Sequence, residues 1–167
     1  VAWHTCCAGD SFQWGRLSAD ILHPPDCVTN LPARAVLRRD NTWSLVARLT
    51  CGDRSLLATG DATLAAEALQ LLAPAQLRAN VLKIAHHGSA TSTGGDYLDA
   101  VRPAIALVSV GAGNPALPSA AVLRRCRARR IKVVRTDRLG AVCVELARAA
   151  AHIYAFEPYV RTGTRTD

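Results

Sequence analysis

The segment Val81-Leu82-Lys83-Ile84-Ala85-His86-His87-Gly88-Ser89 changes abruptly from apolar to polar residues. Its apolar part, together with the preceding Asn80, is typical of a buried β-strand from Asn80 to Ala85, because it is short and rich in aliphatic side chains. After this segment, strands are predicted to alternate with helices: a helix over 96–101, a strand over 104–110, a helix opened by Pro118 and Ser119, and strands over 131–134 and 140–146. This alternation predicts the α/β class, with helices covering a sheet.

The first third of the chain has the pattern of antiparallel strands. Residues 44–50 and 55–59 predict two strands, joined by a hairpin turn at Cys51-Gly52-Asp53-Arg54. Upstream, we expect a hairpin from Trp3 to Trp14 with its turn at Gly9-Asp10, a strand over 19–22 and a loop over 24–41. Leu64, Ala68, Leu71 and Leu72 recur at helical spacing, with Thr63 as the N-cap. From Ala147 we expect a helix that runs to Phe156, followed by a frayed tail.

The composition is that of a folded domain. The 167 residues are 50% hydrophobic and 20% charged, which excludes a disordered chain. The length suits one domain or most of one, and the longest apolar runs are too short to span a membrane. The chain begins with Val and contains no Met, so we expect it to be processed or a fragment.

The positive charge is concentrated in one segment. The net charge is +7, and the stretch from Ala121 to Arg138 holds eight basic residues against the single acidic Asp137. Arginine binds phosphate well through its planar fork of donors. Two interpretations stay open, namely a solvated helix face and a surface that faces a polyanion.

The six cysteines form no CxxC pair, which argues against a zinc finger or a thioredoxin-like motif. Cys126 and Cys143 lie in apolar patterns and are predicted to be core residues. Cys6 or Cys7 could pair with Cys27 in an oxidising compartment.

Two predicted strands end in residues that can carry chemistry. The segment Leu56-Leu57-Ala58-Thr59-Gly60-Asp61 ends in a carboxylate, and the next strand ends in His86 and His87. If both strands belong to one sheet, these side chains share a rim and offer oxygen and nitrogen ligands to zinc, manganese or iron. Such a centre makes hydroxide from bound water near neutral pH. The alternatives are a turn or N-cap at Gly60-Asp61 and a surface or packing role for the histidines. One Asp and one or two His are also too few for a full catalytic metal site, which needs at least three protein ligands and usually more when it holds two metals.

Polar residues near these strand ends extend the candidate site. Ser89, Thr91, Ser92 and Thr93 form a hydroxyl cluster after the histidines. Asn41 precedes a strand and could donate a hydrogen bond to a phosphate or to a carboxylate beside a metal. The alternative for Asn41 is a turn and strand cap.

The order of these motifs resembles the metallo-β-lactamase-like domain of ComEC-type DNA-internalisation competence proteins. The pieces in register are Cys7-Ala8-Gly9-Asp10 with Phe12-Gln13-Trp14, Ile21-Leu22-His23-Pro24, Asp40-Asn41 with Ser44-Leu45-Val46, Leu57-Ala58-Thr59-Gly60-Asp61 with Glu67, Val81-Leu82-Lys83, His86-His87-Gly88-Ser89 with Thr91-Ser92, Val101-Arg102-Pro103, Val108-Ser109-Val110-Gly111, Asn114, and Arg135-Thr136-Asp137 with Gly140.

This resemblance implies an αββα sandwich, of which residues 1–146 would be the C-terminal portion and 147–167 a tail. It implies a metal-dependent nuclease that degrades one DNA strand, by attack of metal-bound hydroxide on a phosphodiester. Asp61 would bridge two zinc or manganese ions, and His86 or His87 would be the late histidine ligand. Asn41, Ser89, Thr91 and Ser92 would lie near the scissile phosphate, and the basic segment, with Arg124, Arg125 and Arg135, would hold the DNA backbone.

The same resemblance implies a membrane-spanning part of the same parent chain in the bacterial inner membrane, with this domain soluble and extracytoplasmic and no small-molecule cofactor. Two departures stand out: the family's early His-rich motif is absent, and Leu117 stands where a His is expected. A degenerate module that binds DNA or supports the channel without catalysis is therefore the alternative. A hydrolase of small esters or amides is a further one.

Overall fold

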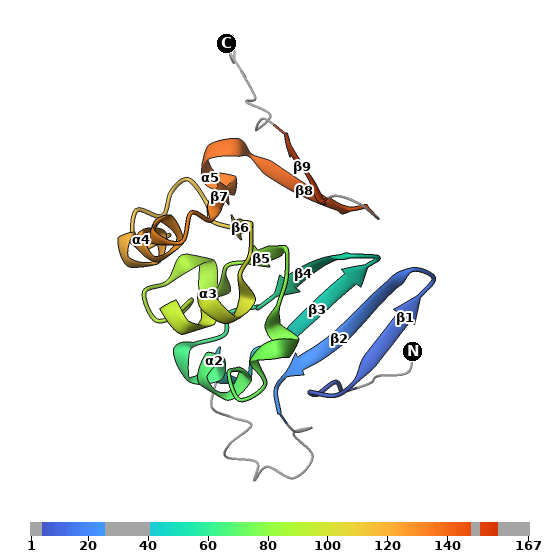
Figure 1. The fold of residues 1–167 in the computed structure, drawn as a ribbon. Helices are drawn as coiled ribbons and strands as arrows, with labels where there is room; N and C mark the ends of the chain where they lie inside the picture. Colours follow the sequence, from blue (N-terminus) through green and yellow to red (C-terminus); the bar gives the residue numbers. More distant parts are fainter. Residues whose placement is uncertain (1–4, 26–40, 148–150, 157–167) are drawn as a thin grey trace, which may run out of the picture.

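The computed structural model describes residues 5–25, 41–147 and 151–156. Seven strands form one sheet in the order of the chain, and two more form a separate hairpin (Figure 1). The seven are β1 (Ser11–Trp14), β2 (Leu17–His23), β3 (Val46–Cys51), β4 (Arg54–Ala58), β5 (Val81–Lys83), β6 (Ile105–Val108) and β7 (Lys132–Arg135). Strands β1 to β4 are antiparallel to their neighbours, whereas β4 to β7 run parallel.

The parallel half is built by crossovers through helices. These are α2 (Leu64–Gln70), α3 (Gly95–Val101) and α4 (Ala120–Ala128), which lie on one side of the sheet (Figure 1). The short α5 (Thr136–Leu139) follows β7, and three single turns complete the described helices: η2 (Asn41–Trp43), η3 (Pro74–Leu77) and η4 (Ala85–Gly88). The predicted α/β class is confirmed at this level.

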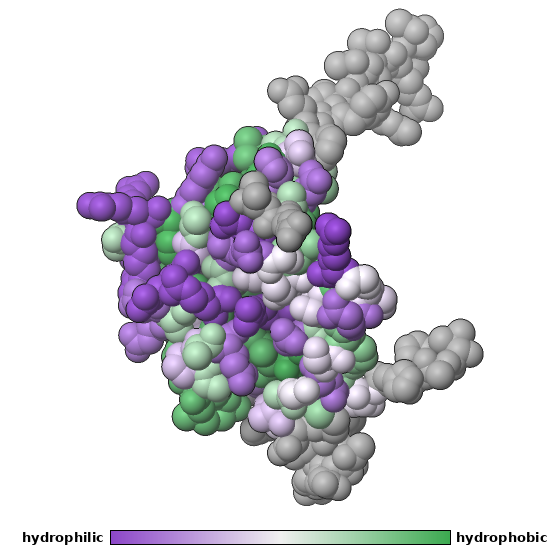
Figure 2. Space-filling model, turned by 45° about the vertical axis from the view of Figure 1, so that its right-hand side comes forward, coloured by the Kyte–Doolittle hydropathy of each residue, from purple (hydrophilic) through white to green (hydrophobic). Residues whose placement is uncertain are grey.

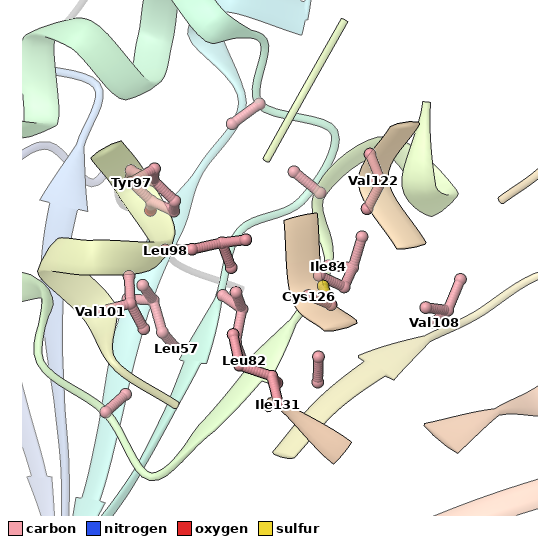
Figure 3. Close-up of a cluster of buried hydrophobic side chains, with 14 of the residues drawn as sticks. Leu57, Leu82, Ile84, Tyr97, Leu98, Val101, Val108, Val122, Cys126 and Ile131 are labelled. Carbon is pink, nitrogen blue, oxygen red and sulfur yellow. The ribbon is translucent and has the colours of Figure 1, made fainter. Parts of the chain in front are cut away.

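The core lies between the parallel strands and these helices. Leu57, Leu82 and Val108 point from β4, β5 and β6 toward α3 and α4, where they meet Leu98, Val101, Val122 and Cys126 (Figure 3). Each of these side chains is buried. Close packing of these buried side chains holds the carboxyl ends of β4, β5 and β6 in a fixed arrangement.

The predicted N-terminal hairpin is wrong in its turn. Gly9-Asp10 does form a turn, since Asp10 N donates to Cys7 O at 3.1 Å, but it precedes β1. The hairpin is β1 with β2, and Gly15 with φ +58° and Arg16 connect Trp14 to Leu17. Glycine favours a turn at Gly9 and at Gly15 alike. The hairpin turns at Gly15 because this lets β1 pair with the apolar strand β2.

The helix α2 begins at its predicted N-cap. Thr63 Oγ1 accepts a hydrogen bond from Ala66 N at 3.5 Å. The buried face, however, consists of Ala66, Glu67 and Gln70, while Leu64 and Leu72 are exposed, the latter to 83%. The apolar periodicity thus predicted the helix but not the face that it buries.

The predicted helix from Ala147 to Phe156 is wrong. Residues Ala151–Phe156 form the strand β9, which pairs antiparallel with β8 (Ala141–Leu146) along its whole length. An Ala-rich segment has high helix propensity, but pairing with a strand whose Val142, Val144 and Leu146 are half-buried overrides it. The division of the chain at residue 146 stays a prediction.

The cysteines divide between core and surface. Cys126 is buried as predicted, whereas Cys143 is exposed, so its predicted place in the core is wrong. In β8, exposed residues such as Cys143 alternate with the half-buried valines. Cys7 is disulfide-bonded. Cys27, the partner suggested by the sequence, lies outside the described residues, as do Trp3 and most of the predicted loop.

None of the helices in the described part of the chain has both the length and the apolar character needed to cross a membrane.

Candidate metal centre

Parallel pairing brings the two polar strand ends to one edge of the sheet. Ala58 at the end of β4 pairs with Lys83 at the end of β5, so the residues after each strand emerge side by side. Asp61 follows β4 and His87 follows β5, and the Asp61 Oδ1 atom lies 3.6 Å from the His87 Nε2 atom. The structure therefore places these two predicted residues together.

The imidazole of His87 is oriented by a backbone carbonyl. Its Nδ1 atom lies 2.6 Å from the carbonyl oxygen of Ser109, which follows β6. Because a carbonyl oxygen only accepts, Nδ1 carries the proton, and in the neutral ring Nε2 presents a lone pair. Two acceptors, Nε2 and the Asp61 carboxylate, then face each other. This is the arrangement of a metal-binding histidine whose second nitrogen is held by a carbonyl.

Lys83 is the cation nearest to this pair among the described residues. Its Nζ atom donates to the Gly60 carbonyl at 2.8 Å and lies 3.9 Å from Asp61 Oδ1. Burial lowers the pKa of the Lys83 ammonium, and the Asp61 charge opposes this shift. Lys83 thus adds positive charge beside the carboxylate while it fixes the Gly60 peptide.

Gly60 allows the chain to turn between β4 and Asp61. Its φ is +51°, and an added Cβ would come within 3.1 Å of the Leu45 carbonyl oxygen. The Gly60 carbonyl also accepts from His86 N at 3.2 Å, so it links the two strand ends.

The two histidines point to different partners. His86 Nε2 lies 3.4 Å from Asn41 Nδ2 in η2, and His86 Nδ1 is buried with no hydrogen-bond partner among the described residues. The backbone is left-handed at three successive residues, His86 (φ +48°), His87 (φ +54°) and Gly88 (φ +86°). Such a conformation is costly for residues other than glycine and is concentrated at functional sites. Of the two histidines, His87 is the one that meets Asp61.

Some hydroxyls of the predicted cluster are used within the fold, whereas others can still bind a ligand. Ser92 is fully buried, and its hydroxyl lies 2.9 Å from the Ala85 carbonyl and 3.0 Å from the Ser89 carbonyl, so its proton is used within the turn. Ser89 Oγ and Thr91 Oγ1 lie 3.0 Å apart nearer the surface. Ser89 and Thr91 can therefore reach a ligand, whereas Ser92 holds the backbone.

Glu67 is a residue near the site to which sequence reasoning assigned no role. Its buried carboxylate accepts hydrogen bonds from Thr93 N and, at 2.8 Å, from Gly94 N. Burial raises the pKa of Glu67, and those two backbone bonds and the Arg125 charge oppose the shift. Arg125 donates from Nη1 to the carbonyls of Ser92 and Thr93, both at 3.1 Å. Glu67 and Arg125 together hold the turn that carries the hydroxyls.

His23 is a second residue that sequence reasoning left without a role. It is buried at the end of β2, and its Nδ1 atom bonds the Ser44 carbonyl at 3.0 Å. Burial lowers the pKa of His23, which favours the neutral ring, and the bond to the Ser44 carbonyl opposes this shift. Since Ser44 packs against Gly60, His23 supports the backbone next to Asp61. The one sign of this supporting role in the sequence is that His23 comes directly after a predicted strand and is followed by proline.

The three arginines predicted to bind DNA have different surroundings. Arg124 is exposed on α4. Arg125 is engaged with the turn as described, and Arg135 forms two hydrogen bonds with the Asp137 carboxylate, at 2.9 and 2.5 Å. The Arg135 guanidinium lowers the pKa of Asp137 through these bonds. Of the three, Arg124 alone has no side-chain partner in the described part of the chain.

The donor set fits part of a metal's coordination sphere. Two ligands at the usual 2.0 to 2.2 Å from one tetrahedral ion lie about 3.4 Å apart, close to the separation of the Asp61 and His87 atoms. No group of three or more His, Cys, Asp or Glu that could hold a metal occurs among the described residues. Leu117, at the position where the resemblance implies a histidine, packs against the core.

Known proteins that are named for competence or recombination are similar in sequence to this chain. Competence protein ComA of Neisseria gonorrhoeae is 36% identical over 155 residues, which are 92% of this chain and 21% of that protein. Recombination protein 2 of Haemophilus influenzae is 36% identical over 140 residues, or 83% of this chain and 16% of that protein. ComE operon protein 3 of Bacillus subtilis is 31% identical over 120 residues, or 71% and 16%.

These similarities support a competence-protein family. The chain spans about a fifth or less of the length of these curated relatives. No family model matches the chain.

Proposed function

We propose that the chain is part of a metal-dependent nuclease that cleaves a DNA strand during DNA uptake, in a metallo-β-lactamase-like αββα fold. The observation that carries the proposal is the pair Asp61 and His87, because an oriented lone pair and a carboxylate 3.6 Å apart suit a shared cation. The similarity to competence proteins supports DNA as the substrate.

Asp61 and His87 would hold the divalent metal, zinc or manganese, with further ligands from outside the described residues and a second ion beside the first. A metal there supplies Lewis-acid polarisation and lowers the pKa of water. The Ser89 and Thr91 hydroxyls donate to phosphate oxygens, and the Lys83 ammonium adds charge that favours the anionic substrate. Asn41 keeps His86 in place at the far side of the turn.

The disulfide at Cys7 supports an oxidising, extracytoplasmic location for this part of the protein. By the same proposal, the partners are DNA and a membrane-spanning part of the parent chain in the inner membrane.

A module that binds DNA without cleaving it is the second candidate. It is favoured by Leu117, whose aliphatic side chain cannot ligate a metal, and by the two-residue donor set of the described chain. This candidate predicts that the protein binds DNA but does not hold metal tightly.

The test is cleavage of labelled single-stranded DNA by the full-length protein loaded with manganese or zinc. The proposal predicts that Asp61→Ala abolishes cleavage, while Asp53→Ala, an exposed carboxylate in the turn between β3 and β4, leaves it unchanged. Equal cleavage by the wild type and Asp61→Ala would contradict the proposal. DNA binding without cleavage by any variant would favour the second candidate.

A further inference from the structure

A groove at the end of α4 gathers four arginines of the basic segment. The groove has a volume of about 400 Å³ and is lined by Arg127 and Arg130 from the end of α4, Arg135 and Arg138 around α5, and the apolar side chains of Leu123, Ile131 and Val133. We propose that this groove binds one nucleotide unit of a single DNA strand beside the candidate metal centre. The inference rests on the proposed function for its choice of DNA as the ligand.

Some of the free cations of the segment line this groove, namely Arg127 and Arg130, whereas Arg124 lies outside it. Arg125 and Arg129 turn toward α3, where Arg129 forms a bidentate pair with Asp99 at 2.7 Å for both bonds. Arg135 is held by Asp137. Arg127 and Arg130 form no side-chain hydrogen bond or ion pair with the described chain, and both are exposed. Figure 2 shows hydrophilic surface gathered on the side of the molecule where α4 lies.

The backbone of Arg130 gives an independent indication. Arg130 follows α4 with φ +56°, at the position after a helix where glycine is the preferred residue. Its amide donates to Arg127 O at 3.0 Å, and Ile131 N donates to Cys126 O at 3.1 Å, which closes the helix end. An arginine in this conformation costs stability that glycine would not, and such strain points to a role for the side chain.

The groove runs along β7, from Arg130 and Ile131 before the strand to Arg135 at its end, and this Arg135 end reaches the edge of the sheet that carries the metal centre. Arg135 is the last residue of β7, and β7 lies two strands from β5, whose end carries His87. Neighbouring strands are about 4.8 Å apart, so the two strand ends are separated by about 10 Å. A strand of a few nucleotides can therefore extend from one site to the other.

The size and lining of the groove favour a single strand. Its volume lies in the range of small-ligand pockets, which is room for one nucleotide and not for a duplex. The arginines suit the phosphate, and the apolar floor of Leu123, Ile131 and Val133 suits the face of a base.

The test is fluorescence anisotropy of a labelled oligothymidylate with the full chain, without added metal, over a range of salt concentrations. Arg127→Gln/Arg138→Gln should weaken binding at least tenfold and reduce the slope of log K against log salt by about 1.4, since each charge contributes about 0.7. The control Arg16→Gln/Arg78→Gln removes two exposed charges elsewhere and should change binding less than twofold.

A second variant separates binding from folding. Arg130→Gly should weaken DNA binding while the stability to urea is unchanged or higher, because glycine relieves the left-handed strain. The proposal is overturned if the groove and control variants weaken binding equally, if Arg130→Gly binds like the wild type, or if duplex DNA binds as tightly as single-stranded DNA. Because this assay measures binding and not cleavage, it tests the groove separately from the proposed nuclease activity. A variant such as Asp61→Ala that loses cleavage but still binds DNA would show that the two are separate.

Discussion

The carboxylate of Asp61 and the imidazole of His87 face each other across the ends of β4 and β5, with Oδ1 and Nε2 3.6 Å apart. The parallel register of the two strands sets this separation, and the Ser109 carbonyl sets the orientation of the ring. The pair therefore joins three neighbouring strands of the sheet in one arrangement.

The hydrogen bond to Ser109 predicts the tautomer of His87. In the neutral ring, nitrogen NMR should find the proton on Nδ1, because Nδ1 lies 2.6 Å from a carbonyl oxygen. His152 on β9 is exposed and stacks on Tyr154, and it serves as the reference ring in the same spectrum. A proton on Nε2 of neutral His87 would remove the lone pair from the side that faces Asp61 and would contradict the proposed ligand role.

Substitution of Gly88 should destabilise the turn that carries His87. In Gly88→Ala, the new Cβ would lie 2.5 Å from Pro118 Cβ, and the residue would keep φ +86°. We expect a loss of about 1 to 3 kcal/mol in the free energy of unfolding, measured with urea. Gly113→Ala is the matched control, since its added Cβ meets nothing within 4 Å. An equal effect of the two substitutions would show that the turn is not so constrained.

Glu67 predicts a pH dependence of stability with a definite sign. Burial raises its pKa in the folded chain, so the folded state binds the proton more tightly than the unfolded state. Relative to Glu67→Gln, the wild type should therefore be most stable below the unfolded pKa and lose stability as the pH rises through the raised folded pKa. Urea unfolding of both proteins across this window tests the sign. A relative stability that rises with pH would mean that the bonds from Thr93 and Gly94 outweigh burial.

The buried hydroxyl of Tyr97 links α3 to α2. It donates to Gln70 Oε1 at 2.6 Å, and burial raises its pKa far above the usual value. Tyr97→Phe leaves the Gln70 oxygen without this donor and should cost about 1 to 3 kcal/mol in unfolding free energy. Tyr154→Phe removes an exposed hydroxyl, which bonds Glu145 at 3.0 Å, and should cost much less. Similar losses in both variants would contradict the structural role of Tyr97.

Local patterns predicted most of the sheet and its helices. The strands β3 to β7 and the helices α2, α3 and α4 stand where apolar periodicity, caps and turn residues indicated them. Asp61 and His87 were identified as candidates because each follows an apolar strand. Their meeting required that the two strands be parallel neighbours, which only the sheet establishes.

Tertiary pairing decided the features that were predicted wrongly. The strand β9 replaces an expected helix because β8 offers it a complete partner, and the first hairpin turns at Gly15 because β1 pairs with β2. Side-chain direction explains why two of the arginines predicted to bind DNA have partners within the fold. Arg125 and Arg135 occupy the predicted basic segment, yet their guanidinium groups bind carbonyls and Asp137 within the fold. Spacing along the chain does not show which arginines find such partners.

Calorimetric titration of the chain with zinc or manganese tests the central claim most directly. The account predicts binding that weakens at least tenfold in both Asp61→Ala and His87→Ala, while His152→Ala, on the exposed face of β9, binds like the wild type. Metal affinity that is the same in Asp61→Ala, His87→Ala and the wild type would contradict it.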